Sequence, residues 1–152
     1  MRTLKKMLFL SFALSLAAGC AGGRMMTHEP TLYERLGGKP AIEAVVEDFV
    51  SRLAADMRIS NARVAARFST THVPSLKMHL VNQICEAAGG PCKYTGRDMQ
   101  SAHAGLEITM AEFNAVVDDL VAALNKFKVP EKEKNELLSV LGPMNKEIVQ
   151  KP

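Results

Sequence analysis

The sequence contains no tryptophan, and aromatic residues make up only 5% of it. A folded core must therefore be built mainly from aliphatic side chains. No segment shows the sustained two-residue alternation of strands, and no internal repeat or low-complexity block occurs. Because several stretches instead have helical apolar spacing, these absences predict an all-α fold.

Several kinds of reaction chemistry also have no residues to carry them. The sequence has no nucleophile with an oriented base, no phosphate-cradling glycine loop and no metal-binding cysteine cluster. A hydrolase or a nucleotide-dependent enzyme therefore has no support. The apolar run from Met7 to Leu16 is too short to cross a bilayer as a permanent helix.

The chain has no excess of either charge once the N-terminal segment is set aside. The chain has 19 basic and 16 acidic residues, and residues 1–19 hold three of the basic ones and none of the acidic ones. Without them the two signs balance. No electrostatic surface for phosphate backbones remains, so nucleic acid is excluded as a partner.

The N-terminal segment itself predicts export. Arg2, Lys5 and Lys6 precede the apolar run, and small residues lead to Cys20, as in a lipoprotein signal peptide. We expect residues 1–19 to be removed, residues 20–30 to form a lipid-anchored tether on Cys20, and residues 31–152 to fold as one domain. This places the protein in the periplasm or at a cell-envelope membrane. A plain signal peptide cleaved nearby is the alternative.

Two further cysteines, Cys85 and Cys92, lie seven positions apart. In an oxidising compartment they could close a small loop as a disulfide. The alternative is a pair of free thiols, because the sequence does not give the distance between their α-carbons.

Helical spacing and capping signals recur through the predicted domain. Thr31 and Glu34, and later Thr109 and Glu112, have the spacing of capping boxes at helix starts. Glycine pairs and prolines separate the segments. The predicted helices cover a short turn after Thr31 and then residues 40–53, 62–68, 75–88, a short piece around 103, 109–124 and 130–141.

Of the four histidines, His79 and His103 lie among apolar residues of predicted helices. Met99 and Leu106 share a helical face with His103. An imidazole in such surroundings is the setting of a haem proximal ligand, and it is also the setting of an ordinary core histidine. The residues alone leave both interpretations open.

A series of blocks in one order resembles the group I truncated globins of bacteria, protists and algae over residues 31 to about 149. The opening block is Leu32 to Gly38, and Ala41 to Phe49 resembles the second helix. The later blocks are Phe68-Ser69, Ala87 to Gly90, Tyr94 to Gly96, Met99 to His103 and Ile108 to Phe113.

The resemblance implies a two-over-two helical sandwich around haem b, with His103 as the proximal iron ligand. It also implies which other residues line the cofactor: Phe68, Leu76, His79, Leu80, Tyr94, Met99, Ile108, Phe113 and Val116. Arg97 or Lys77 could lie near the haem propionates, although a solvated surface charge is the simpler interpretation of both.

The distal side departs from the family's common pattern. Val50 stands where a tyrosine is usual, and Leu76 and Leu80 stand where glutamines are common. The hydrogen-bond donors that stabilise a bound oxygen molecule are therefore absent from these positions. Tight oxygen storage by a tyrosine–glutamine network is not expected.

His79 precedes Leu80, at a position where some cyanobacterial and algal relatives have a histidine that binds the iron. We expect two axial imidazoles and a six-coordinate iron. The alternative is that His79 points to solvent or to a haem propionate.

The function expected from these features is a membrane-tethered haem protein that binds diatomic ligands such as O2 or NO, exchanges electrons with an unidentified donor, or does both. An enzyme, a nitric oxide dioxygenase, is one alternative, which Val50, Leu76 and Leu80 disfavour. A haem-free globin-fold binding module is another, which Phe68 and His103 disfavour.

Overall fold

The computed structural model describes residues 28–59 and 61–151, in which helices are the only regular elements and one isolated bridge joins Thr109 to Lys151. The prediction of an all-α fold is confirmed. The predicted signal peptide, Cys20 and the tether up to residue 27 lie outside the described residues. Among the helices that are described, none combines the length and the apolar character that a membrane crossing requires.

The helices follow the order predicted from the apolar spacing. Their bounds are α1 (Leu32–Arg35), α2 (Gly38–Ala55), α3 (Ala62–Thr70), α4 (Val73–Ala87), α5 (Met99–His103), α6 (Met110–Lys126), α7 (Glu131–Leu141) and α8 (Asn145–Ile148), with 3-10 turns η1 (Met57–Ile59) and η2 (Gly142–Met144).

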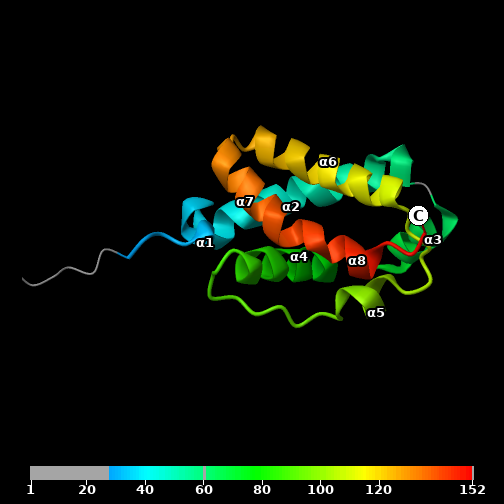
Figure 1. Cartoon of the computed structure of the whole chain (residues 1–152). Coiled ribbons are helices and arrows are strands. Elements are labelled where there is room, and N and C mark those ends of the chain that lie inside the picture. The colour runs from blue at the N-terminus through cyan, green and yellow to red at the C-terminus, as the bar shows by residue number, and fades with distance from the viewer. Residues whose placement is uncertain (1–27, 60, 152) are drawn as a thin grey trace, which may run out of the picture.

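Two pairs of helices make the body of the molecule. α2 packs along α4, and the pair is covered by α6 and by α7 with its continuation α8 (Figure 1). α2 contacts α6 across the pair, and α4 contacts α7. The short α5 lies at the edge and packs against α8 (Figure 1). This is the two-over-two arrangement that the sequence predicts.

The core is aliphatic, as the scarcity of aromatic residues requires. Its buried members come mostly from α2, α4 and α6, with Leu32 from α1 and Leu137 from α7. Phe49 is the only aromatic side chain among the buried residues of this described cluster. α2 and α4 thus meet through branched aliphatic side chains, which interdigitate closely.

Both predicted capping boxes are present. The Thr31 hydroxyl accepts a hydrogen bond from the Glu34 amide, and the Thr109 hydroxyl accepts one from the Glu112 amide. In each box the glutamate side chain accepts the threonine amide in return, which satisfies two free donors at the helix start. Several helix bounds differ from the predicted ranges by one or two residues, and α8 was not predicted. At the start of α4, which begins at Val73, Pro74 lies inside the first turn, where proline has no hydrogen bond to lose.

Candidate functional site

His103 ends the short helix α5. The Asp98 carboxylate caps this helix by accepting the Ser101 amide at 2.8 Å. Nδ1 of His103 lies 2.8 Å from the backbone carbonyl oxygen of Met99, one turn earlier. Because a carbonyl can only accept, Nδ1 carries the proton and Nε2 is left with its lone pair. The helix therefore holds the imidazole in the tautomer that a metal ligand needs.

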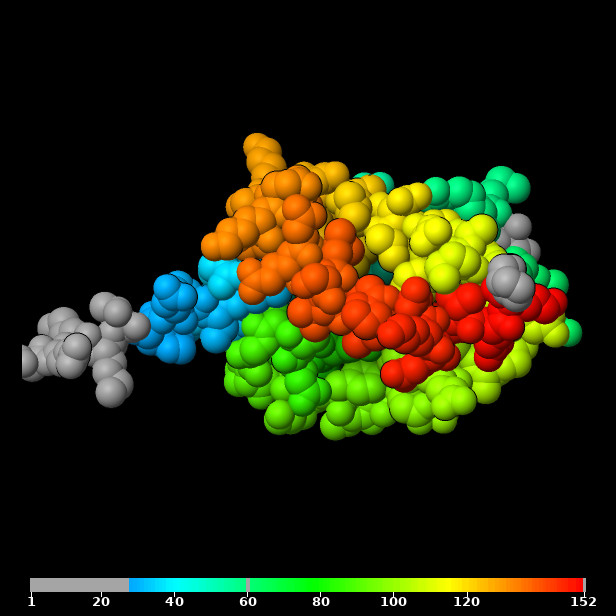
Figure 2. Space-filling model, in the orientation of Figure 1, coloured from blue at the N-terminus to red at the C-terminus, as the bar shows by residue number. Residues whose placement is uncertain are grey.

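The turn that follows α5 is held by a residue from the far end of the chain. The Gln150 side chain donates to the His103 carbonyl at 3.0 Å and accepts the Glu107 amide. Glu107 has a left-handed backbone conformation, with φ of 55°. The Gln150 amide also bonds the Ile108 carbonyl. Figure 2 shows this C-terminal segment running over the body beside α5.

His79 lies in the middle of α4 and is half-buried. Its Nδ1 atom is buried and has no hydrogen-bond partner among the described residues. Its ring meets the Tyr94 ring edge-on, with centroids 5.9 Å apart and planes at 69°. A buried imidazole nitrogen without a partner is unusual and costs free energy unless something else binds it.

Tyr94 lies in the loop between α4 and α5 and is fixed at both ends. Its amide donates to the Glu86 carboxylate at 2.9 Å, and its hydroxyl donates to the Arg97 carbonyl at 2.6 Å. Burial raises the pKa of the Tyr94 hydroxyl. The bond from the Tyr94 amide, with help from Lys93, lowers the pKa of Glu86. Near neutral pH the Tyr94 hydroxyl therefore stays neutral, and the Glu86 carboxylate stays charged.

The same loop is joined covalently to α4. A disulfide links Cys85, which is fully buried near the end of α4, to Cys92, with α-carbons 5.7 Å apart. The separation lies within the usual range for a disulfide. The bond ends two residues before Tyr94, so the loop next to His79 is attached at several points.

Val50, Leu76 and Leu80 stand where the family usually has hydrogen-bond donors, and all three lie in an apolar environment. Val50 is 2% exposed and belongs to the core cluster. Leu76 and Leu80 on α4 pack against that cluster, as do Phe68 of α3 and Val116 of α6. The side chains of Val50, Leu76 and Leu80 therefore offer no hydrogen bond to a ligand.

The other predicted lining residues are partly buried in and around α5 and α6. Met99, Ile108 and Phe113 are each of intermediate exposure. The Gln83 amide nitrogen lies 3.4 Å from the sulfur of Met99 and 3.4 Å from that of Met144. Gln83, Met144 and Gln150 carry no local sequence signal, because their contacts join residues far apart in the chain.

The two basic residues suggested for the propionates have other surroundings. Lys77 makes an ion pair with Glu47 of α2, with its ammonium 2.6 Å from the carboxylate. Arg97 is exposed, and its carbonyl holds Tyr94. Lys77 is thus engaged on the outer side of the α2–α4 pair.

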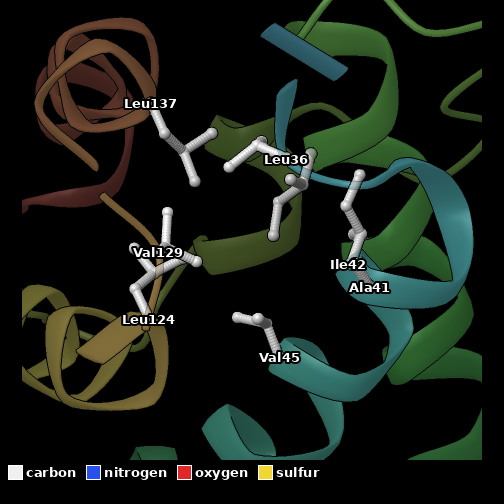
Figure 3. Close-up of a pocket in the computed structure, with 8 residues that line it drawn as sticks. Leu36, Ala41, Ile42, Val45, Leu124, Val129 and Leu137 are labelled. Carbon is white, nitrogen blue, oxygen red and sulfur yellow. The ribbon is translucent and has the colours of Figure 1, made fainter. Parts of the chain in front are cut away.

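A separate apolar pocket lies between the starts of α2 and α7 (Figure 3). Aliphatic side chains from α2, α6 and α7, and from Leu36 just after α1, point toward one another in it. Its walls contain no histidine and none of the residues predicted to line haem; they consist of Leu36, Ala41, Ile42, Val45, Ile84, Leu124, Val129 and Leu137. We do not assign the cofactor to this pocket.

The histidine environments fit a haem iron. His103 has one ring nitrogen committed to a backbone carbonyl and the other uncommitted, and His79 has a buried nitrogen with no partner. Within residues 28–59 and 61–151 no three His, Cys, Asp or Glu side chains gather as a metal site. Isolated imidazoles suit an iron whose other ligands come from a porphyrin.

A family model described as bacterial-like globin matches residues 31–150 of this chain. The group 1 truncated haemoglobin of Mycolicibacterium paratuberculosis is 37% identical over 126 residues, which cover 82% of this chain and 89% of the relative.

Solved structures show the same similarity. The Fe(III) form of the truncated haemoglobin from Tetrahymena pyriformis matches with a TM-score of 0.70 at 29% identity, covering 79% of this chain and 98% of that one. The 2/2 haemoglobin of a Synechococcus species, in the cyanomet state with covalently attached haem, matches with a TM-score of 0.69 at 28% identity and the same coverage.

Proposed function

Because this chain belongs to the bacterial-like globin family, with group 1 truncated haemoglobins as relatives, we propose that it is a haem protein with two histidine ligands that binds diatomic gases and exchanges electrons. Haem itself follows from the family. The choice of ligands and the use of the iron are the parts that the proposal adds.

The proximal ligand is His103. Its Nδ1 proton is held by the Met99 carbonyl at 2.8 Å, which directs the lone pair of Nε2 away from the helix backbone. The bond also makes the imidazole a stronger electron donor. Gln150 supports the same position by binding the His103 carbonyl.

The distal ligand is His79, and the observation that carries the proposal is a half-buried ring whose Nδ1 atom makes no hydrogen bond to the described residues, so that no such bond ties the ring to another part of the fold. The Tyr94 ring meets the His79 ring edge-on. An imidazole that no hydrogen bond holds elsewhere is available to bind iron. His79 and His103 together would hold the haem, and a haem held by two imidazoles would supply one-electron exchange.

The apolar side chains of Val50, Leu76 and Leu80 limit the reactions that the haem can support. Nitric oxide dioxygenase chemistry requires a stabilised oxygen ligand, and these side chains donate no hydrogen bond to it. A gas must also displace His79. We therefore propose reversible gas binding and electron exchange with an unidentified donor rather than an enzyme.

We propose further that the protein is exported and held at a cell-envelope membrane by a lipid on Cys20. The residues before Cys20 support this, since a basic start, an apolar run and small residues form a lipoprotein-type signal. The disulfide supports an oxidising compartment. Residues 28–31 lead into α1 at one end of the molecule (Figure 1).

Absorption spectra of the ferric and ferrous protein test the ligand assignment. We expect six-coordinate, low-spin bands for the wild type. His79→Ala should become high-spin, because the distal nitrogen is lost, and His103→Ala should lose most of its haem. His72→Ala is the matched control: this histidine is exposed at the start of α4 and bonds Ser75, so its removal should leave the spectrum unchanged.

A wild type that is already high-spin, with a spectrum that His79→Ala leaves unchanged, would show that His79 is not a ligand. Gas binding to a five-coordinate iron would then be the better account. Retention of haem and of an unchanged spectrum in His103→Ala would contradict the proximal assignment.

A further inference from the structure

Tyr94 contacts His79, the proposed distal ligand. Several bonds within and around the loop that contains Tyr94 keep this contact in place. The loop runs from the end of α4 at residue 88 to Asp98, the cap of α5. Its tyrosine ring meets the His79 ring edge-on with centroids 5.9 Å apart. An edge-on aromatic pair favours one mutual orientation, so a fixed Tyr94 restricts the orientation of His79.

The backbone of the loop wraps closely around the phenol. A methyl group at Gly96 would lie 2.4 Å from the Tyr94 hydroxyl oxygen, so the phenol packs directly against the backbone of Gly96. The hydroxyl donates to the Arg97 carbonyl at 2.6 Å. The ring can therefore not rotate away without opening the turn at residues 94–97.

The attachment to α4 lies about two turns beyond His79. Glu86 accepts the Tyr94 amide at 2.9 Å and pairs with Lys93 at 3.0 Å. The neighbouring residue, Cys85, forms the disulfide with Cys92. The hydrogen bond to Glu86 and the disulfide thus hold the loop residues before Tyr94 against α4, the helix that carries His79.

From these contacts we propose that Tyr94 is a positioning residue for His79 and that the Cys85–Cys92 disulfide keeps it in that role. The proposal rests on the assignment of His79 as the distal ligand. With the disulfide closed, Tyr94 keeps the imidazole in its buried place. With the disulfide open, the loop loosens, His79 leaves the iron more often, and external ligands bind faster.

The disulfide opens by exchange with a dithiol. Cys92 is partly exposed and Cys85 is fully buried, so the thiolate of the dithiol attacks the Cys92 sulfur. The S–S bond breaks, Cys85 leaves as a thiolate and takes a proton, and the second thiol of the reductant then releases Cys92. The protein gains two electrons and two protons, and the dithiol becomes a cyclic disulfide.

The test measures the rate at which cyanide binds the ferric full-length haem protein, together with the low-spin fraction in its absorption spectrum. The variants are Cys92→Ser, which prevents the bond at a partly exposed position, and Tyr94→Leu, which removes the edge contact. Tyr94→Phe keeps the ring and removes only the hydroxyl bond to the Arg97 carbonyl. Mass-spectrometric counting of alkylated thiols reports the state of the disulfide, and thermal unfolding reports folding.

We expect Cys92→Ser, and the wild type treated with dithiothreitol, to bind cyanide about two- to tenfold faster, in line with the loss of one aromatic contact. Tyr94→Leu should give a similar increase, and adding Cys92→Ser to it should add little, since both act through one contact. Tyr94→Phe should fall between the wild type and Tyr94→Leu, because it keeps the ring but loses the hydroxyl bond to the Arg97 carbonyl.

Different results contradict the role of Tyr94 and the assignment of His79 as the distal ligand. A low-spin wild type whose cyanide rate is the same with the disulfide open, or whose Tyr94→Leu variant still responds fully to Cys92→Ser, overturns the role of Tyr94 and leaves His79 as the ligand. A wild type that is high-spin and insensitive to His79→Ala overturns both.

Discussion

Gly90 shows how closely the loop after α4 approaches its neighbours. A methyl group at this position would lie 2.5 Å from the ring of Tyr33 and 2.7 Å from the Cys85 sulfur. Gly142 offers a comparison, because a methyl group there meets nothing within 4 Å and its backbone is helical. The two glycines are thus present for different reasons.

We predict that Gly90→Ala lowers the free energy of unfolding by about 1–3 kcal/mol, the usual effect of forcing an extra carbon into a packed region. Gly142→Ala should be neutral or raise it by up to about 1 kcal/mol, because alanine restricts the unfolded chain. Urea unfolding followed by circular dichroism measures both. Equal stabilities of the two variants would contradict the packing argument.

Asp119 of α6 is a buried carboxylate that is poorly satisfied. Its Oδ2 atom has no hydrogen-bond partner among the described residues. Burial raises its pKa, and the nearby charge of Asp56 raises it further, against the attraction of Arg58 at 3.9 Å. The folded protein therefore holds a proton on Asp119 more tightly than the unfolded chain does.

We predict that Asp119→Asn raises the melting temperature at pH 7 by about 2–4 °C, the shift for a gain of about 1 kcal/mol. The sign follows from the raised pKa: the ionised group costs stability above that pKa, and the cost disappears as the pH falls toward its ordinary value of 3.8. The advantage of the variant should shrink over the same range in calorimetry.

Asp118→Asn is the control for this prediction. Asp118 is exposed and pairs with Arg58 at 2.8 Å, so its substitution should give no gain at pH 7. A gain in Asp118→Asn equal to that in Asp119→Asn would attribute the effect to net charge rather than to burial.

Sequence reasoning at the residue scale succeeded where the partners are close in the chain. The capping boxes at Thr31 and Thr109 each join residues three positions apart, so their spacing predicts the bonds. The roles of individual haem-lining residues remain predictions. The contacts of Tyr94 with His79 and of Gln150 with His103 have no such local signal, because the fold brings them together from 15 and 47 positions apart.

At the scale of elements, periodicity predicted the order of the helices and most of their bounds. The start of α4 differs from the predicted residue 75, because the first turn of the helix includes Pro74. Proline lacks a donor that a helix start does not use. Packing of α4 against α2 then decides in favour of the longer helix.

The connection between α5 and α6 depends on a segment beyond α8. Gln150 bridges the carbonyl of His103 and the amide of Glu107, which stand at the two ends of the turn after α5. Glu107 and Gly105 both have positive φ, at 55° and 73°, so the turn has an unfavourable conformation for glutamate. The side-chain amide of Gln150 offsets part of this cost.

We predict that Gln150→Ala increases the rate of haem loss about two- to fivefold, the effect expected for losing exposed hydrogen bonds. Transfer of haem to an excess of a second apo-globin measures the rate. Gln100→Ala on α5 is the matched control, because Gln100 is exposed. If both variants lose haem at the wild-type rate, Gln150 does not support the proximal segment.

At the scale of the whole molecule, the two-over-two arrangement follows from the resemblance and not from periodicity. Helical spacing in segments such as residues 40–53 predicts which face is buried, but any helical bundle would bury it. The structure pairs α2 with α4 and sets α6 and α7 against them. The apolar spacing in the sequence therefore predicts the helices, whereas the packing of the helices is predicted by the family resemblance.

The charge balance gives a prediction about the mature protein. The full chain has an isoelectric point near 8.8, and the expected signal peptide holds three of its 19 basic residues. Export and cleavage before Cys20 leave equal numbers of both signs, so the mature protein should focus near neutral pH. Isoelectric focusing of the protein from membrane and soluble fractions measures this. A band near 8.8 in the membrane fraction would indicate an uncleaved precursor.

The bonds that Gln150 makes also have a consequence for biogenesis. The segment that carries His103 is completed by a residue translated 47 positions later. A chain emerging from the ribosome or from a translocation pore can form α2 and α4 early, but the proximal turn lacks its support until residue 150 has emerged. Firm capture of the cofactor is therefore a late event, which follows the synthesis of the last residues of the chain.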